Sequence, residues 1–230
     1  MAFNLQTFKT RTLTAILFAA VMLGGLLWNL WSFLVLFTVI HFGCWYEFVK
    51  LMKKTHGNKY LMYCLFGLVY ISLPVLMMLD LYKHTEVHLS DTYIILNKGL
   101  IPLIIIGSIW INDTMAYLVG SLIGKTPLSK ISPKKTVEGT VGGIILCVTV
   151  AGLIIYCIYD LRILTIFSMM IAAICAVFGT AGDLLESKLK RMADVKDSGS
   201  FMPGHGGFLD RFDSLLIAVP FVWLYVKLFL

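Results

Sequence analysis

The segment from Gly182 to Ser214 concentrates residue types that could do chemistry. It holds six of the chain's 13 acidic residues: Asp183, Glu186, Asp194, Asp197, Asp210 and Asp213. Asp183 and Glu186 are three residues apart and so share a helix face, and Asp210 and Asp213 repeat this spacing. Carboxylates that converge from two helix ends suit Mg²⁺, which completes its shell with water and substrate phosphates. These four residues therefore predict a metal site, with surface ion pairs to nearby basic residues as the alternative.

A glycine-rich run, PGHGG, occupies residues 203–207 of the same segment. Gly204, Gly206 and Gly207 would let backbone N–H groups wrap around an anion, and a helix start just after the run would add its positive dipole end. The run predicts a phosphate-binding loop, although an ordinary turn also explains the glycines. His205 could donate to phosphate, carry a proton or make a structural hydrogen bond, and the sequence does not choose among these.

A third candidate segment covers residues 110–143. Asp113 lies nine residues before a predicted helix end near residue 122, which is about 13 Å inside the helix. A buried aspartate in an apolar helix is costly, so Asp113 is predicted to be a functional residue. In the SPKKT run that follows, Ser132, Lys134 and Lys135 could hold phosphate oxygens. The alternative for these lysines is a loop that contacts anionic lipid headgroups.

The elements that carry these residues must be membrane helices. Hydrophobic residues make up 59% of the 230 residues and charged residues 14%, against about 25% charged in soluble domains. This composition excludes an ordinary soluble protein, and the long apolar runs predict helices rather than strands. The predicted fold is an all-α polytopic membrane protein with about seven transmembrane helices, at about 12–28, 30–50, 60–80, 98–122, 139–159, 163–185 and 213–230.

The positions of the basic residues predict an orientation. With the N-terminus in the cytosol, 15 of the 19 Lys and Arg residues fall on the cytosolic side and 4 outside, as the positive-inside rule requires. The candidate residues then gather in the cytosolic segments 123–138 and 186–212. We attribute the formal charge of +6 to this excess of basic residues on the cytosolic side. No nucleic-acid partner is expected.

The chain resembles a known family over residues 110–214. From Ser187 to Asp213 it reads S-x-L-K-R-x4-K-D-x-G-x2-M-P-x-H-G-G-F-x-D-R-F-D, which looks like the signature of the phosphatidate cytidylyltransferases, or CDP-diacylglycerol synthases. The segments NDTMAYLVG, SPKKTVEGTVGG and WYEFVKL are similar to other shared segments of that family. Val137, Ser121 and Met202 depart from the usual pattern, whereas the acidic and glycine positions are intact.

The resemblance implies an enzyme of phospholipid biosynthesis that condenses CTP with phosphatidic acid to give CDP-diacylglycerol and pyrophosphate. It implies Mg²⁺, with a second cation left open, and a catalytic transmembrane domain at 98–230 after N-terminal transmembrane helices at 1–97. The expected metal ligands are Asp183 and Asp210, with Glu186 and Asp213 as further candidates. The expected catalytic residues are Asp183, Asp210, Lys190, Arg191 and His205. The expected substrate-binding residues are Asp113, Ser132, Lys134, Lys135, Lys196, Gly204, Gly206, Gly207 and Arg211.

Two other functions fit less well. A CTP-dependent lipid-alcohol kinase would use similar groups but would move only the γ-phosphate. A transporter would place polar residues at the membrane midplane, whereas here they gather at one face. The expected location is a bacterial inner membrane with the site in the cytosol and the lipid bilayer as partner, and a homodimer is left open.

Overall fold

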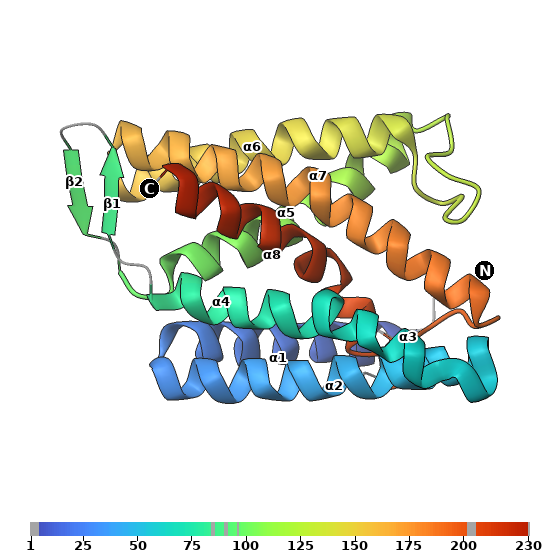
Figure 1. Ribbon diagram of the computed structural model, residues 1–230. Coiled ribbons are helices and arrows are strands. Elements are labelled where there is room, and N and C mark those ends of the chain that lie inside the picture. The colour runs from blue at the N-terminus through green and yellow to red at the C-terminus, as the bar shows by residue number, and fades with distance from the viewer. Residues whose placement is uncertain (1–4, 84–85, 90–91, 96, 202–205, 230) are drawn as a thin grey trace. The chain divides into compact units, whose positions relative to one another are not determined.

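The computed structural model describes residues 5–83, 86–89, 92–95, 97–201 and 206–229. Helices dominate these residues (Figure 1). Their bounds are α1 Leu5–Leu27, α2 Leu30–His56, α3 Tyr60–Gly67, α4 Leu73–Lys83, α5 Leu100–Ile123, α6 Val137–Tyr159, α7 Arg162–Met192 and α8 Leu209–Phe229. A 3₁₀ turn, Gly57–Lys59, joins α2 to α3, and a π-helical turn, Leu68–Ser72, joins α3 to α4.

The helices confirm an all-α polytopic membrane protein. Among the described residues, five helical stretches are long and apolar enough to cross a membrane, and a shorter apolar stretch, Thr12–Leu27, precedes them. The first of the five, Leu30–Lys83, is 54 residues long and contains the turn at Gly57 where α2 ends. This stretch includes both of the spans predicted at 30–50 and 60–80. Each of the seven predicted ranges therefore falls largely on helix.

Two details differ from the sequence-based expectations. Helix α7 continues to Met192, so that Glu186 and Lys190 lie on a helix and not in a loop. The residues involved, ESKLKRM, are mostly good helix formers, and hydropathy marks only where the apolar part of a helix ends. The second difference is a short antiparallel hairpin between α4 and α5, formed by β1 (Glu86–Leu89) and β2 (Thr92–Ile95).

The chain divides into two compact units, Met1–Ser72 with Leu189–Phe212 and Leu73–Lys188 with Asp213–Leu230. We refer to them as unit 1 and unit 2. The compact units do not test the predicted division into N-terminal transmembrane helices at 1–97 and a catalytic transmembrane domain at 98–230. That division stays a prediction.

In unit 1, helix α2 packs against α1 and α3 (Figure 1). A capping box starts α2, because Asn29 Oδ1 accepts from the Ser32 amide at 2.9 Å and Ser32 Oγ accepts from the Asn29 amide at 3.0 Å. Phe33 and Phe37 are fully buried and stacked. A Cβ on Gly67 would collide with the Trp45 ring, so this glycine allows α3 to approach α2 closely.

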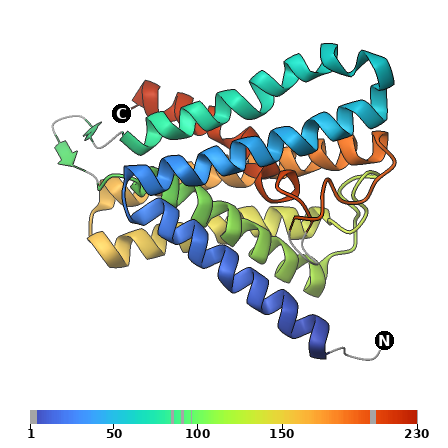
Figure 2. The ribbon, with the colours of Figure 1, turned by 90° about the horizontal axis from the view of Figure 1, so that it is seen from below.

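In unit 2, α5 and α6 run side by side in both views (Figures 1 and 2). Glycines of α6 make this contact close, since a Cβ on Gly143 would collide with Ala116 and one on Gly139 would collide with the α5 backbone. Small buried residues, namely Cys147, Ala151, Ala172 and Ala176, form a core between α6 and α7. The loop between α5 and α6 lies at one end of this helical layer (Figure 2).

Candidate active site

Three carboxylates come together in unit 2. One oxygen from each of Asp183, Glu186 and Asp213 lies within 4.8 Å of the others, and we refer to these residues as the carboxylate triad. Glu186 and Asp213 are buried and Asp183 is half-buried. The three-residue spacing on α7 puts Asp183 and Glu186 on one helix face, as predicted, and Asp213 faces them from α8. The grouping and the charge of these hard oxygens fit a divalent cation.

Small residues on α7 allow α8 to come this close. A Cβ on Gly182 would lie 2.5 Å from the backbone oxygen of Asp213, and one on Gly179 would lie 3.3 Å from Ser214 Cβ. The Asp213 side chain is also oriented locally, because its Oδ1 accepts from the Ser214 amide at 2.6 Å. The triad is therefore held by helix packing rather than by a loop.

Like charges come together around the triad. Asp213 experiences the like charges of Glu186 and Asp113 and the opposite charge of Lys135. Lys135 itself forms an ion pair with Asp183. Carboxylates that are brought together away from water repel each other unless a cation or a proton compensates them. A bound divalent cation would supply that compensation.

The loop between α5 and α6 is folded so that Lys135 reaches α7. Its two arms pair through Leu128 N to Lys135 O at 2.7 Å and Val137 N to Thr126 O at 2.9 Å. Glu138 accepts from the Lys125 and Thr126 amides at 3.1 Å each, and these bonds fix the first arm.

The second arm of this loop ends in a helix cap. Thr136 caps α6 by accepting from the Gly139 amide at 3.1 Å. Ser132 is half-buried and Lys134 is exposed near Lys135. Both residues were predicted to bind substrate, and that role stays a prediction.

Asp113 differs from the sequence-based expectation of a buried carboxylate. It lies on α5 well before the helix ends at Ile123, as predicted, but its side chain is exposed. The buried polar residue is its neighbour Asn112, which is 5% exposed. The reason is helix phase, because the face of α5 that carries Asn112 and Ala116 is the one packed on α6, while Asp113 lies one residue further around.

A second pair of carboxylates, Glu47 and Asp210, lies in unit 1 and is saturated with donors. Glu47 of α2 is 4% exposed and accepts from Ser198 Oγ at 2.6 Å, from the Phe208 amide at 2.9 Å and from the Leu209 amide at 2.8 Å. A Cβ on Gly207 or Gly199 would collide with this carboxylate. Glu47 therefore binds the start of α8 and the loop before it.

Asp210 completes this arrangement from α8. Its Oδ2 accepts from the Ser198 amide at 2.9 Å and the Gly207 amide at 2.8 Å, and its Oδ1 pairs with Lys190 Nζ at 2.6 Å. We refer to Glu47 and Asp210 with these donors as the loop clasp. Asp210 was predicted to bind metal and lies outside the triad. Its metal-binding role stays a prediction, and it would require the carboxylate to exchange Lys190 for the cation.

The remaining predicted residues occupy the segment around the clasp. Lys190 is mostly buried, with 13% of its side chain exposed, whereas Arg191, Lys196 and Arg211 are exposed. Gly206 has a positive φ of 83°, a conformation that favours glycine. Gly204 and His205 lie outside the described residues.

Sequence comparison identifies the family of this chain. A model of the cytidylyltransferase family matches residues 95–229, which is more than half of the chain. The chain belongs to the cytidylyltransferase family. Three curated relatives bear the name phosphatidate cytidylyltransferase: that of Bacillus subtilis is 49% identical over 122 residues, that of Staphylococcus saprophyticus 48% over 113 residues and that of Staphylococcus haemolyticus 43% over 113 residues.

The aligned regions cover 53%, 49% and 49% of this chain and 45%, 43% and 43% of the three relatives. The chain therefore spans less than half of the length of the relatives it matches. The triad, Lys135 and Asp210 all lie within the cytidylyltransferase match. The family resemblance seen in the sequence is thus confirmed.

Glu47 lies before the residues that match the cytidylyltransferase family and was not among the predicted site residues. Its partners follow it by about 150 positions, so no local spacing could reveal them. Two signals were available. Glu47 lies in the WYEFVKL segment that resembles the family, and a carboxylate within the apolar run of α2 is costly unless it has a partner.

Proposed function

We propose that this protein transfers the CMP moiety of CTP to phosphatidic acid, giving CDP-diacylglycerol and pyrophosphate. The observation that carries the proposal is the carboxylate triad with Lys135 beside it, within a cytidylyltransferase match whose relatives bear the corresponding name. We place the site at the cytosolic face of a bacterial inner membrane, because the basic residues cluster on that side. A homodimer stays a prediction.

The reaction is a displacement at phosphorus. A phosphate oxygen of phosphatidic acid bonds to the α-phosphorus of CTP, and the bond from that phosphorus to the bridging oxygen of the β-phosphate breaks. Pyrophosphate leaves with the electron pair. The nucleophile is already an anion, so the protein needs to position two polyanions and balance their charge rather than remove a proton.

The residues divide this work by charge. Asp183, Glu186 and Asp213 would hold Mg²⁺, which when bound supplies charge neutralisation at the phosphates, and a second cation stays open. Lys135 lies beside the triad and would meet a phosphate oxygen of the nucleotide, with Ser132 and Lys134 on the same loop. Lys190, Arg191, Lys196 and Arg211 would contact phosphates in unit 1. Asp113 would orient a ligand or a water molecule on the metal.

The test uses purified protein in detergent–lipid micelles with phosphatidic acid, Mg²⁺ and CTP labelled at either the α- or the γ-phosphate. We expect the α-label to enter the lipid fraction, the γ-label to leave as pyrophosphate, and EDTA to stop the reaction. Transfer of the γ-label to lipid would indicate a kinase instead. Absence of lipid label from the wild-type protein under conditions in which a curated relative is active would overturn the proposal.

A further inference from the structure

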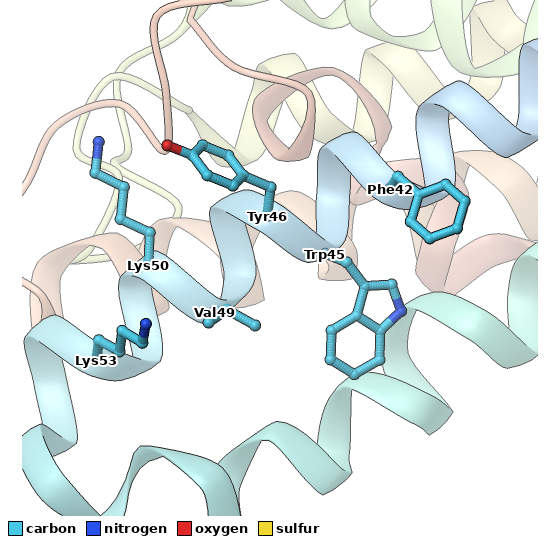
Figure 3. A pocket seen from close by; sticks show the side chains of 6 residues that line it. All are labelled: Phe42, Trp45, Tyr46, Val49, Lys50 and Lys53. Atoms are coloured by element: carbon cyan, nitrogen blue, oxygen red, sulfur yellow. The ribbon is translucent and has the colours of Figure 1, made fainter.

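A groove runs along the face of α2 in unit 1. One part has a volume of about 650 Å³ and lies between α2 and the loop before α8, with Val39, Phe42, Lys50, Ser200 and Phe201 in its lining. The adjoining part has a volume of about 600 Å³ and is lined by Phe42, Trp45, Tyr46, Val49, Lys50 and Lys53. Figure 3 shows Phe42 at one end of this second part and the two lysines at the other.

The groove is divided by polarity along the helix axis. Phe42, Tyr46 and Lys50 are four residues apart, so they share one face of α2, and Phe42 and Tyr46 are 66% and 73% exposed. The apolar part precedes the lysines. Lys53 makes a cation–π contact with Tyr60, with its Nζ 4.9 Å from the ring centroid. Thr38, Ser198, Ser200 and the hydrogen-bonded Glu47 also line the first part, so the division is one of charge at Lys50 and Lys53 against exposed rings at Phe42 and Tyr46. A ligand with an anion at one end and a hydrocarbon chain at the other would match it.

The length of the groove matches one membrane leaflet. From Val39 to Lys50 the helix rises about 16 Å at 1.5 Å per residue, and half of a hydrocarbon core of about 30 Å is about 15 Å. With the lysines at the level of the headgroups, an acyl chain would extend along Phe42 and Val39 toward the bilayer centre.

The opposite wall distinguishes this groove from an ordinary lipid-facing helix surface. It is formed by residues 198–201 and Phe208, of which Ser198 and Phe208 are bound to Glu47. The Phe201 and Phe208 rings pack at 4.1 Å between centroids. Hydrogen bonds and ring packing thus hold this wall in place, and it belongs to the segment that carries the predicted phosphate-binding residues.

We infer that this groove binds the acceptor lipid, a phosphatidic acid molecule, with its phosphate at Lys50 and Lys53 and an acyl chain along Phe42 and Val39. The identity of the lipid as a substrate rests on the proposed function. The selectivity for an anionic lipid rests on the groove alone and is tested without CTP.

The binding test uses tryptophan fluorescence, to which Trp45 contributes as one of five tryptophans. The Trp45 ring is oriented by a hydrogen bond from Nε1 to Ser72 Oγ at 2.9 Å. The protein is reconstituted in phosphatidylcholine nanodiscs that contain a small fraction of phosphatidic acid brominated on its acyl chains. We expect more quenching than with equally brominated phosphatidylcholine. This excess should disappear in Trp45→Phe, which removes the tryptophan that lines the groove, and should fall in the Lys50→Gln/Lys53→Gln double variant.

The kinetic test measures the KM for phosphatidic acid, as a mole fraction in mixed micelles, and the KM for CTP. We expect Lys50→Gln and Lys53→Gln each to raise the lipid KM about fivefold and to leave the CTP KM unchanged. Lys59→Gln is the matched control, because Lys59 is exposed at the same end of α2 and does not line the groove.

The two tests separate the groove from the proposed reaction. Selective quenching in a protein that transfers no CMP would support the groove and overturn the proposed function. CMP transfer with equal quenching by both brominated lipids, and with an unchanged lipid KM in the double variant, would overturn the groove and leave the function standing.

Discussion

The carboxylate triad of unit 2 and the loop clasp of unit 1 use the same chemical group in opposite ways. In the clasp, Glu47 and Asp210 accept from backbone amides, from the Ser198 hydroxyl and from Lys190. In the triad, the carboxylates of Asp183, Glu186 and Asp213 face one another, with Lys135 as a cationic partner. Donors satisfy the first group, whereas the second concentrates negative charge.

The difference predicts two separate roles for the acidic residues of this membrane protein. A carboxylate whose lone pairs are occupied by N–H and O–H donors stabilises the native conformation. Carboxylates placed against each other destabilise it unless a ligand compensates them, and such groups typically mark functional sites. The comparison therefore predicts that substitutions in the triad affect activity and that substitutions in the clasp affect stability first.

The largest effect is expected from Asp213→Asn. This change keeps the shape of the side chain and removes a charge from the triad, so we expect CMP transfer to fall by about 100-fold or more. The thermal midpoint should stay the same or rise, because like-charge repulsion is relieved. Asp160→Asn is the control, since Asp160 is an exposed residue that caps the end of α6. Near-normal activity in Asp213→Asn would contradict the prediction that the triad is needed for activity.

The next largest effect is expected from Glu47→Gln. The amide nitrogen cannot accept the hydrogen bonds that a carboxylate oxygen accepts, so we expect a loss of about 1.5–3 kcal/mol in the free energy of unfolding. Limited proteolysis should also cut the 198–208 loop faster than in the wild-type protein. Unchanged unfolding and unchanged cleavage would show that the clasp is not a stabilising element.

Lys135→Gln should sharpen the account of the triad. Removal of the cation beside Asp183 leaves the triad more negative, so less Mg²⁺ should be needed for half-maximal activity. The KM for CTP should rise, because a phosphate contact is lost. Lys130→Gln is the control, as Lys130 is exposed on the same loop. A Mg²⁺ requirement that rises in Lys135→Gln would contradict this charge balance.

The smallest effect is expected at an ion pair that belongs to neither the triad nor the clasp. In unit 2, Asp80 Oδ2 accepts from Trp223 Nε1 at 2.8 Å and pairs with Lys227 Nζ at 2.9 Å. The Lys227 and Asp80 side chains are 39% and 47% exposed, so Asp80→Asn should cost at most about 1 kcal/mol of unfolding free energy and leave activity intact. A substantial loss of CMP transfer in Asp80→Asn would show that sensitivity to charge removal is general and not a property of the triad.

The sequence predicted much of the fold because long apolar helices can be recognised directly from hydropathy. The shared face of Asp183 and Glu186 was also within reach, since i, i+3 spacing fixes which acids of one helix lie together. The choice between Asp210 and Asp213 as their neighbour from α8 depends on how α8 packs on α7, which spacing does not determine. The clasp was not within reach, because Glu47 and its partners are far apart in the sequence. The exposure of Asp113 depends on the rotation of α5 against α6, which the glycine contacts at Gly139 and Gly143 determine.

Binding of Mn²⁺ in place of Mg²⁺ tests the central claim most directly. Electron paramagnetic resonance of free Mn²⁺, titrated with purified protein in the absence of CTP, counts the ions bound. We predict that the wild-type protein and Glu47→Gln remove Mn²⁺ from solution, and that Asp183→Asn and Asp213→Asn bind it at least about tenfold more weakly. Equal binding by the wild-type protein and Asp213→Asn would contradict the assignment of the triad as the metal site.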